Sequence, residues 1–489
     1  MPLPVIKDLK VSIIDSIKQW TLNYTDLELN SNKFYSLEIV KGSDNKIYLY
    51  TQYGRVGRTA AKEYRACIDR HQAEVEAEKI IKSKNKKGYV EIKLIKADIG
   101  SEVAKVKVGT SVVSEDAAKK LGFTVKEDVQ SSLHPAVQSL VKEWFGSIEQ
   151  FIVDTLDTSK CALGQLSLDQ INKGRDYLLE ARKIVAAGAK DIKELNSLSS
   201  KYYSNIPMNF GYRKLDIDQL RFDSDSKLDQ AFDILDTLEG AKDVEKVLTK
   251  KNAVDEQYKS LKTEMEWLDH SDPIFKWIES LFHKTRASNH SGLGKLAVSG
   301  VFKLARPKEY EIFLSEAGKI AQAKYGIALP NNYKGHWDKR PKESKEYEEL
   351  MAAANILPLW HGSRTPNFPK IISSSLQMRK PGFTVAGSMF DKNGGLYFAN
   401  SSSKSVGYTS ISNSAWSNGN DKKAYLFLSD VCLGKSKIAD RAHPYTLEGI
   451  KPHMSVWAKA GVSLYNDEYI VYTEQQNWLR YVVEFESVK

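Results

Sequence analysis

Apolar and polar residues alternate along short runs near the start of the chain. The runs 33–42 and 45–54 are rich in β-branched and aromatic side chains, and a Gly-Ser-Asp-Asn turn joins them. Residues 60–82 contain no Gly or Pro and many Ala, Glu, Lys and Arg, a composition that predicts a helix. Residues 88–95 return to a strand pattern. The first region therefore predicts a small mixed α/β module over residues 33–96.

Residues 132–268 follow a helical pattern instead. Apolar side chains recur at the spacing of one helix face in two stretches: Val137, Leu140, Val141, Trp144, Phe145 and Ile148, and later Leu228, Ala231, Phe232, Leu235 and Leu238. We expect a helical bundle here. It contains no obvious cluster of catalytic side chains.

Residues 269–489 change character again, because glycine, serine and aromatic residues become more frequent. Five short runs, each β-branched or aromatic and bounded by turn residues, predict strands at 357–362, 394–400, 424–434, 468–473 and 479–486. Strands of this kind between long loops indicate an α+β domain that is mainly antiparallel.

Composition supports a folded chain with several domains. Of the 489 residues, 42% are hydrophobic and 27% are charged, which excludes wholesale disorder and a collagen-like structure. The three cysteines lie far apart and form no C-x-x-C, so a disulfide framework and a Cys-based zinc finger are excluded. No run approaches 18 apolar residues and the start does not resemble a signal peptide. We expect a soluble intracellular protein.

Charge is distributed unevenly. Residues 1–110 carry an excess of six basic side chains, residues 130–265 an excess of three acidic ones, and residues 266–489 an excess of seven basic ones. Basic regions at the two ends are compatible with polyanion binding or with a solvated, lysine-rich surface. Charge alone does not decide between them.

Several common catalytic motifs are missing. The sequence has no G-x-G-x-x-G after a strand, no G-x-x-x-x-G-K-[ST], no H-E-x-x-H and no G-x-S-x-G. These absences argue against a Rossmann-type dinucleotide site, a P-loop, and the common metal and hydrolase sites.

Three clusters in the last region remain as candidates for chemistry. His361 beside Gly362 at a strand end offers an imidazole and an open backbone to a flat polar ligand, or is a core histidine in a turn. Tyr397, with Ser405 and Tyr408 downstream, could enclose an aromatic ring, or could belong to an ordinary core.

The third cluster is the carboxylate pair Asp467-Glu468 at the start of an apolar strand. A carboxylate there could orient a ribose hydroxyl, stabilise an oxocarbenium-like centre or activate a nucleophile. The alternative is a solvated strand end.

In order and spacing, the three clusters resemble one family. The segments HGSRTPNF, GGLYFA with K-S-x-x-Y downstream, and NDEYIVY are similar to the His-Tyr-Glu signature of the poly(ADP-ribose) polymerases. Residues 133–267, with LGQLSLDQI and YYSNIPMNFG, resemble the regulatory helical domain of that family, and YGRVG at 53–57 resembles its WGR domain. About the first 30 residues and the segment 97–131 lie outside the resemblance.

The chain departs from the family pattern at three positions. Tyr53 replaces the tryptophan that names the WGR domain, Ser375 replaces a turn glycine, and Gln377 stands where members often carry an arginine near the adenosine. Gln377 puts the adenosine contacts in doubt, whereas the Tyr53 ring can still stack on a sugar or base.

The resemblance implies a multidomain α+β protein. Its parts would be a WGR-like α/β DNA-binding domain at 1–105, a linker at 106–131, an all-α regulatory bundle at 132–268 and an ADP-ribosyltransferase catalytic domain at 269–489. The catalytic domain would be α+β and mainly antiparallel.

The resemblance also assigns roles. His361 would bind the adenosine-side ribose of NAD⁺, Tyr397 would wall the nicotinamide pocket, and Glu468 would act on the nicotinamide ribose and on the acceptor. Further NAD⁺-binding residues would be Gly362, Ser363, Ser405 and Tyr408, and the acceptor side would include Met389 and Lys404. NAD⁺ would be consumed as a substrate, with no cofactor and no metal.

The implied function is a poly(ADP-ribose) polymerase that DNA breaks stimulate and that modifies proteins, including itself. Contacts to DNA would come from Tyr53, Arg55, Lys84 and Lys86, although Arg55 could equally contact the helical domain. The helical domain would block the NAD⁺ pocket until DNA binds. The location would be nuclear in a eukaryote, or the cytoplasm and nucleoid in a bacterium.

Three alternatives stay open. One is a mono-ADP-ribosyltransferase with the same pocket. Another is a DNA-independent transferase whose WGR-like module binds protein, for which Tyr53 leaves room. The last is a DNA-end-binding scaffold with a degenerate pocket, against which the intact His361, Tyr397 and Glu468 argue.

Overall fold

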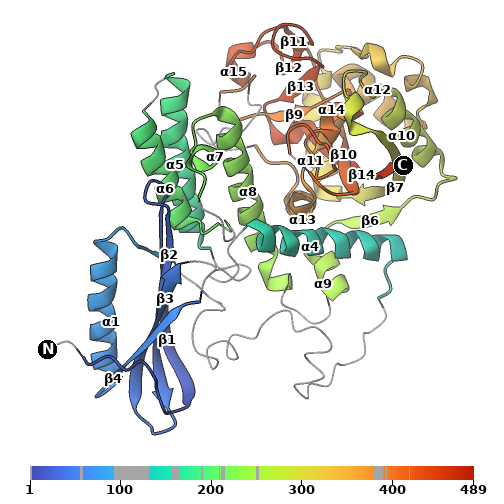
Figure 1. Cartoon of the computed structure of the whole chain (residues 1–489). Helices are drawn as coiled ribbons and strands as arrows, with labels where there is room; N and C mark the ends of the chain where they lie inside the picture. The colour runs from blue at the N-terminus through green and yellow to red at the C-terminus, as the bar shows by residue number, and fades with distance from the viewer. Residues whose placement is uncertain are drawn as a thin grey trace. The chain divides into compact units, whose positions relative to one another are not determined.

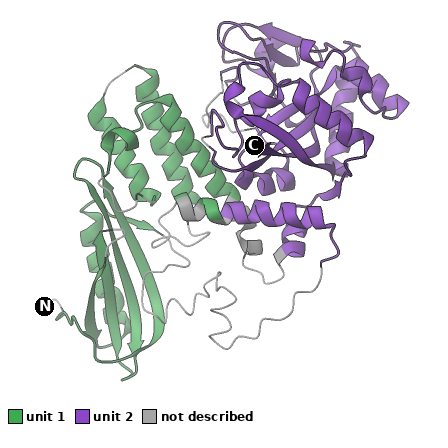
Figure 2. Ribbon diagram, turned by 45° about the vertical axis from the view of Figure 1, so that its right-hand side comes forward, with its two compact units in different colours: residues 1–129, 149–249 green, residues 130–148, 250–489 purple. Residues whose placement is uncertain are grey.

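The computed structural model describes most of the chain. The described residues are 3–55, 59–92, 131–155, 166–188, 191–208, 210, 215–248, 253–378, 389–392, 394–417 and 419–488. They form two compact units, 1–129 with 149–249 and 130–148 with 250–489 (Figure 2). The sequence-based domain boundaries stay predictions, and the linker proposed at 106–131 lies outside the described residues except for Ser131.

The first unit contains an antiparallel sheet with the strand order β4-β3-β2-β1-β5 (Figure 1). Its strands are β1 (Ile13–Asp26), β2 (Ser31–Gly42), β3 (Ile47–Arg55), β4 (Ala61–Cys67) and β5 (Val90–Ile92). Helix α1 (Arg70–Asn85) packs Ala73, Ala77 and Ile81 against the apolar face of this sheet. The small module is therefore a sheet covered by one helix.

Two expectations for this module are wrong. Residues 60–82 are not one helix, because Ala61–Cys67 pair with β3 and the helix begins only after Asp69, whose side chain accepts from the backbone N–H of Gln72. Strand pairing outweighs the helix-forming composition of this segment. The first 30 residues are not outside the module either, since β1 lies between β2 and β5.

The first unit also contains much of the helical region, which confirms the helical prediction there. Its helices are α5 (Leu168–Ala186), α6 (Ile192–Asn205), α7 (Ile217–Leu220) and α8 (Asp225–Leu248). Helix α5 begins with a capping box between Ser167 and Gln170. Arg175 of α5 is buried and pairs with Asp236 of α8 at 2.7 Å.

Hydrogen bonds join α6 to the C-terminal part of β1 within this unit. The Asn23 side chain donates to the carbonyls of Tyr203 and Ser204 at 3.2 and 3.0 Å, and the Thr25 N–H donates to Ser204 Oγ at 2.8 Å. These groups are buried, so each bond also satisfies a polar group that water cannot reach. The junction is specific rather than a loose apolar contact.

The second unit is built on two sheets. The larger has the order β6-β7-β14-β10-β8 and the smaller β11-β12-β13-β9, with all neighbours antiparallel except β11 and β12. The strands are β6 (Glu264–Trp267), β7 (Lys295–Ala305), β8 (Ile356–Gly362), β9 (Leu396–Phe398), β10 (Lys423–Cys432), β11 (Ser436–Ala439), β12 (Ser455–Ala458), β13 (Glu468–Val471) and β14 (Asn477–Val488). The five predicted strands correspond to β8, β9, β10, β13 and β14.

Short helices surround these sheets: α9 (Ala253–Ser260), α10 (Pro273–Lys284), α11 (Pro307–Ala321), α12 (Lys345–Ala354), α13 (Phe368–Ser374), α14 (Ser402–Val406) and α15 (Leu447–Ile450). The start of α4 (Pro135–Thr155) also belongs to this unit. There the buried Trp144 contacts Phe368 and Tyr425, with ring centroids 5.4 and 5.7 Å apart. None of the helices that the structure describes is long and apolar enough to cross a bilayer.

Candidate active site

His361 is the second-last residue of β8, an edge strand of the larger sheet, and it pairs with Phe427 of β10. Its Nδ1 is 2.9 Å from the Tyr397 carbonyl, and a carbonyl only accepts, so Nδ1 carries the proton and Nε2 is the acceptor. Burial lowers the pKa of His361, and the bond to the Tyr397 carbonyl opposes this effect. The site therefore holds a neutral imidazole with a fixed tautomer.

Tyr397 lies in β9, which pairs with β13. Its hydroxyl donates to Asp391 Oδ2 at 2.7 Å and accepts from the Phe390 N–H at 3.0 Å. Asp391 is only 3% exposed, and its other oxygen accepts from the Gly394 N–H at 2.7 Å. Burial and the Asp391 carboxylate raise the pKa of Tyr397 far above its ordinary value, so the ring is neutral. The sequence analysis missed Asp391, because a loop carboxylate carries no periodic signal.

Glu468 is the first residue of β13, and its side chain is 9% exposed. Lys404 of α14 holds one oxygen, with Nζ 2.8 Å from Oε1, while Oε2 is buried without a partner among the described residues. Burial raises the pKa of Glu468, and Lys404 partly opposes the shift. A buried carboxylate oxygen without a partner is costly, so it marks a place where a ligand group can bind.

Strand pairing brings the three sequence-predicted catalytic residues together. Tyr397 pairs with Ile470, two residues beyond Glu468, and the neighbouring Trp360 and Ala399 form a bridge that joins the end of β8 to β9. The His361 ring lies 5.8 Å from that of Phe398. Three chain segments far apart in sequence thus meet at one edge of the smaller sheet.

Gly362 and Ser405 are in close contact. A Cβ at position 362 would lie 1.9 Å from the Ser405 carbonyl oxygen, so only glycine fits there. The Ser405 hydroxyl donates to the Trp360 carbonyl at 3.1 Å, which leaves its oxygen able to accept. Ser363 Oγ accepts from the Asn367 amide at 3.1 Å. The backbone of the strand end is thereby fixed against α14.

Tyr408 follows α14 and is half-buried. Its ring is stacked on Trp416 with centroids 6.1 Å apart and an interplanar angle of 23°, and Trp416 is 61% exposed. A flat, partly open aromatic pair of this kind can receive another ring. Sequence analysis named Tyr408 but not Trp416.

The two residues expected on the acceptor side differ in environment. Lys404 is buried in the ion pair with Glu468, and burial lowers its pKa while Glu468 raises it. Met389 is 40% exposed.

Ser375 at the end of α13 has φ of 64°, the left-handed region that favours the glycine it replaces. Gln377 follows this turn.

The residues expected to contact DNA lie in the first unit, and three of the four are engaged within it. The Tyr53 hydroxyl donates to Glu63 at 2.7 Å, and its ring is stacked on Tyr35 at 5.1 Å. Lys84 Nζ lies 3.9 Å from the centroid of Tyr35, and burial lowers the pKa of this lysine. Lys86 is exposed.

Arg55 is the fourth of these residues. It donates to both the carbonyl and the side-chain oxygen of Asn30, at 2.8 and 3.2 Å. The same Asn30 oxygen accepts from the N–H of Leu215, in the helical region, at 3.1 Å. Of the two contacts that the sequence left open for Arg55, the structure contains a connection toward the helical region, made through Asn30.

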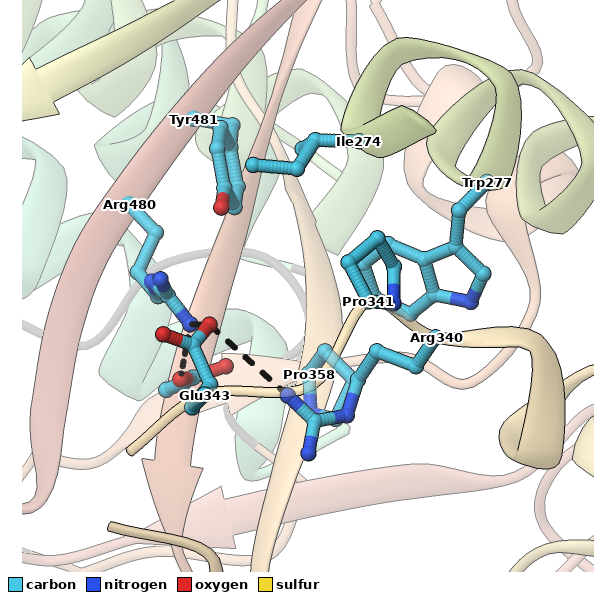
Figure 3. A pocket seen from close by; sticks show the side chains of 9 residues that line it. Ile274, Trp277, Arg340, Pro341, Glu343, Pro358, Arg480 and Tyr481 are labelled. Carbon is cyan, nitrogen blue, oxygen red and sulfur yellow. Dashed lines mark hydrogen bonds and ion pairs between the residues drawn. The ribbon is translucent and has the colours of Figure 1, made fainter. Parts of the chain in front are cut away.

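A small cavity lies elsewhere in the second unit, between α10 and the larger sheet (Figure 3). With a volume of about 10 Å³, it has room for about one water molecule. The charged side chains around it pair with one another, for example Arg480 with Glu343 at 2.8 Å and with Asp430 at 3.0 Å. The cavity is thus surrounded by an internal network of ion pairs and has no room for a substrate. Among the described residues, no group of His, Cys, Asp and Glu is placed to hold a metal ion.

Comparison with known families assigns three parts of the chain. Residues 18–95 match the WGR domain, residues 131–265 the poly(ADP-ribose) polymerase regulatory domain, and residues 274–456 the poly(ADP-ribose) polymerase catalytic domain. The catalytic match ends before Glu468, so the position of that residue rests on the pairing of β13 with β9.

Similar proteins carry the same family name. A poly(ADP-ribose) polymerase of Sarcophaga peregrina is 27% identical over 84% of this chain and 37% of its own length. Poly(ADP-ribose) polymerase 1 of Gallus gallus is 25% identical over 95% of this chain and 44% of its own. Poly(ADP-ribose) polymerase 2 of Homo sapiens is 24% identical over 95% of this chain and 78% of its own. The chain thus spans less than half of the first two relatives.

The three domains occur in one order along the chain, and the strand pairing places the His-Tyr-Glu residues at one site. The chain belongs to the poly(ADP-ribose) polymerase family.

Proposed function

We propose that this protein transfers ADP-ribose from NAD⁺ to protein side chains, including its own, and extends the product into a polymer while releasing nicotinamide. The observation that carries this proposal is the buried Glu468 carboxylate, held through Oε1 by Lys404 and unpartnered at Oε2 among the described residues. NAD⁺ is a substrate here, so no Rossmann fingerprint is required.

The strand end of β8 provides the groups that would bind nicotinamide. The Gly362 backbone and the Ser405 hydroxyl lie together, and the Ser405 oxygen can accept from a carboxamide N–H while donating to Trp360. The Tyr408 ring would stack on the pyridinium, where a cationic ring gains about 0.5–2 kcal/mol from the aromatic face. Together these groups would hold nicotinamide, the leaving group, in place.

His361 would orient the other half of the dinucleotide. Because Nδ1–H is bonded to the Tyr397 carbonyl, the Nε2 lone pair is available to accept from a ribose hydroxyl. The lowered pKa of His361 keeps this acceptor unprotonated at neutral pH. Tyr397 would act as a wall, since Asp391 already holds its hydroxyl.

Glu468 would act at the reacting carbon. The bond between the ribose C1′ and the nicotinamide nitrogen breaks, and its electron pair leaves with nicotinamide. The carboxylate would accept from the ribose 2′-hydroxyl and stabilise the positive charge at C1′. An acceptor hydroxyl then bonds to C1′ and gives up its proton to Glu468, whose pKa burial raises, so that it is a stronger base than an exposed carboxylate.

Polymer synthesis differs from single transfer in its acceptor, which is a previous ADP-ribose and not only a protein side chain. A glutamate at position 468 can activate a ribose hydroxyl of a previous ADP-ribose, whereas a residue without a carboxylate cannot. We therefore favour elongation over mono-ADP-ribosylation.

DNA breaks are proposed as the stimulus. The exposed Lys82, Lys86 and Lys87 at the end of α1 form a basic group suited to phosphate. The location would then be a compartment that contains DNA, the nucleus in a eukaryote or the nucleoid in a bacterium. The proposal that the helical domain blocks the NAD⁺ pocket until DNA binds stays a prediction.

A DNA-independent transferase is the second candidate, because Tyr53, Arg55 and Lys84 are already engaged within the first unit. The experiment that decides is NAD⁺ consumption and product length with and without nicked or blunt DNA, for the wild type and Glu468→Gln. DNA-stimulated polymer that shortens or disappears in the variant supports the proposal. Turnover indifferent to DNA favours the second candidate, and no turnover in the wild type rejects both.

A further inference from the structure

His290 lies in the loop after α10 and contacts two segments of the candidate site. Its Nδ1 is 2.8 Å from Ser403 Oγ, and its Nε2 is 3.2 Å from the side-chain nitrogen of Asn466. Ser403 immediately precedes Lys404, and Asn466 lies two residues before Glu468. One imidazole therefore bridges the segments that carry the two charged residues of the site.

The hydrogen-bond pattern fixes the state of this histidine. The amide nitrogen of Asn466 can only donate, so Nε2 accepts and Nδ1 carries the proton. Nδ1–H then donates to Ser403 Oγ, which also accepts from the Ala287 N–H at 2.9 Å. His290 is thus neutral, with each ring nitrogen committed to one partner.

The chain of contacts continues to Glu468. The Asn466 carbonyl accepts from Lys404 Nζ at 2.8 Å, and the same ammonium lies 2.8 Å from Glu468 Oε1. Lys404 is therefore held between the Asn466 backbone and the Glu468 carboxylate. A shift of Asn466 would move the ammonium relative to the carboxylate.

We propose that His290 is a positioning residue, which acts through Asn466 to hold Lys404 against Glu468. The inference rests on the proposed transferase function, because it concerns the geometry of the group that would act at C1′. His290 itself need not touch NAD⁺ or the acceptor.

The proposal makes the site sensitive to acid. The charged groups that face His290 are Lys404 from α14 and Arg286 from its own loop, while Glu468 and Asp467 lie beyond Lys404. Burial, then Lys404 and Arg286, lower the pKa of His290, so it stays neutral at physiological pH. On protonation Nε2 becomes a donor that faces the donor of Asn466, and this contact breaks.

Two substitutions separate the two contacts. In His290→Gln the longer amide can place its oxygen near the position of Nε2 and accept from Asn466. In His290→Asn the shorter amide reaches Ser403 but not Asn466. The two variants are similar in polarity, so comparison of their melting temperatures controls for folding.

We expect His290→Asn to lower kcat by about 10- to 100-fold at little change in the KM for NAD⁺, the size expected when a reacting group is misplaced. His290→Gln should retain most of the activity. As the pH is lowered, its kcat should fall less than that of the wild type, because glutamine does not take up a proton. Equal kcat in the two variants, or an acid limb that His290→Gln leaves unchanged, would overturn the proposal.

A second readout does not depend on turnover. Lys404 is buried, so its acetylation by a small reagent, followed by mass spectrometry, reports how firmly it is held. Labelling should be faster in His290→Asn and unchanged in His290→Gln. If wild-type protein consumes no NAD⁺, the proposed function fails while this measurement still decides whether His290 positions Lys404. Equal labelling of Lys404 in all three proteins would reject the positioning role.

Discussion

Lys404 Nζ lies 2.8 Å from Glu468 Oε1, and the two side chains are only 10% and 9% exposed. Sequence analysis placed both residues in the site but did not pair them, because 64 positions separate them along the chain. The pair holds opposite charges away from water, where each depends on the other for compensation. Removing either partner should therefore affect both stability and chemistry.

Lys404→Met is predicted to destabilise the protein more as pH rises. The pKa of Glu468 is already raised by burial, and losing the ammonium raises it further. Folded protein then holds a proton that the unfolded chain has lost, so stability falls as pH rises between the ordinary and the raised pKa. We expect a loss on the order of 3 kcal/mol at about pH 8 and a smaller loss at about pH 5.5. Melting temperatures at the two pH values measure this.

The double variant Lys404→Met/Glu468→Gln is the control for that series, because it has no buried carboxyl to titrate. Its melting temperature relative to wild type should depend less on pH than that of the single variant. If both variants lose stability equally at the two pH values, the buried carboxylate is not the cause.

Gly362→Ala is predicted to damage the strand end. The new Cβ would lie 1.9 Å from the Ser405 carbonyl oxygen, a backbone atom that cannot rotate away. Overpacking of this kind costs about 3 kcal/mol, and the shift of α14 should also raise the KM for NAD⁺. Gly318→Ala in α11 is the matched control, since nothing lies within 4 Å of its Cβ and the helix should gain about 0.5–1 kcal/mol. Equal melting temperatures for the two variants would contradict this account.

The strand-end motifs could be predicted from the sequence, but the strand pairing that brings them together in the fold could not. His361, Tyr397 and Glu468 each lie at or near a strand that its apolar run indicates. That β9 pairs with β13, and not with another strand, depends on contacts between distant segments that no local pattern records. Asp391 and His290 lie in loops, where no periodic pattern singles out a polar residue.

The errors in the N-terminal module have a similar cause. Residues 61–67 have the composition of a helix, but pairing with β3 gives them a partner that local propensity does not record. β1 was missed because its alternation is weak at the start, where its residues are only half-buried. The Arg55 contact with Asn30 likewise could not be chosen from spacing, since Asn30 lies in the turn between β1 and β2.

Tyr397→Phe is predicted to cost stability rather than substrate affinity. The substitution removes a donor to Asp391 Oδ2 and an acceptor for the Phe390 N–H, both in a buried site. Leaving such groups unpaired costs about 1–3 kcal/mol, while the ring that walls the pocket is retained. A melting-temperature loss with an unchanged KM for NAD⁺ is the expected result. A raised KM at unchanged stability would mean that the hydroxyl contacts the substrate.

Asp391→Asn tests the same contact from the other side. The amide has one acceptor oxygen where the carboxylate has two, so it can keep the bond from the Tyr397 hydroxyl or the bond from the Gly394 N–H, but not both. We therefore expect this variant to be destabilised about as much as Tyr397→Phe. The double variant should lose less than the sum of the two single losses, because both act on one hydrogen bond. Strict additivity would show that the two groups are independent.

Lys84→Met is predicted to affect stability, and Lys86→Met is predicted to affect DNA binding. Lys84 lies over the Tyr35 ring and is half-buried, so its loss should remove a cation–π contact worth about 0.5–2 kcal/mol and leave DNA affinity nearly unchanged. Lys86 is exposed at the end of α1, so its loss should weaken binding to a nicked duplex and reduce the salt dependence by about one phosphate contact. Binding measured at several salt concentrations, with melting temperatures alongside, separates the two residues. A larger loss of DNA affinity in Lys84→Met would show that this ammonium leaves the tyrosine ring to bind phosphate.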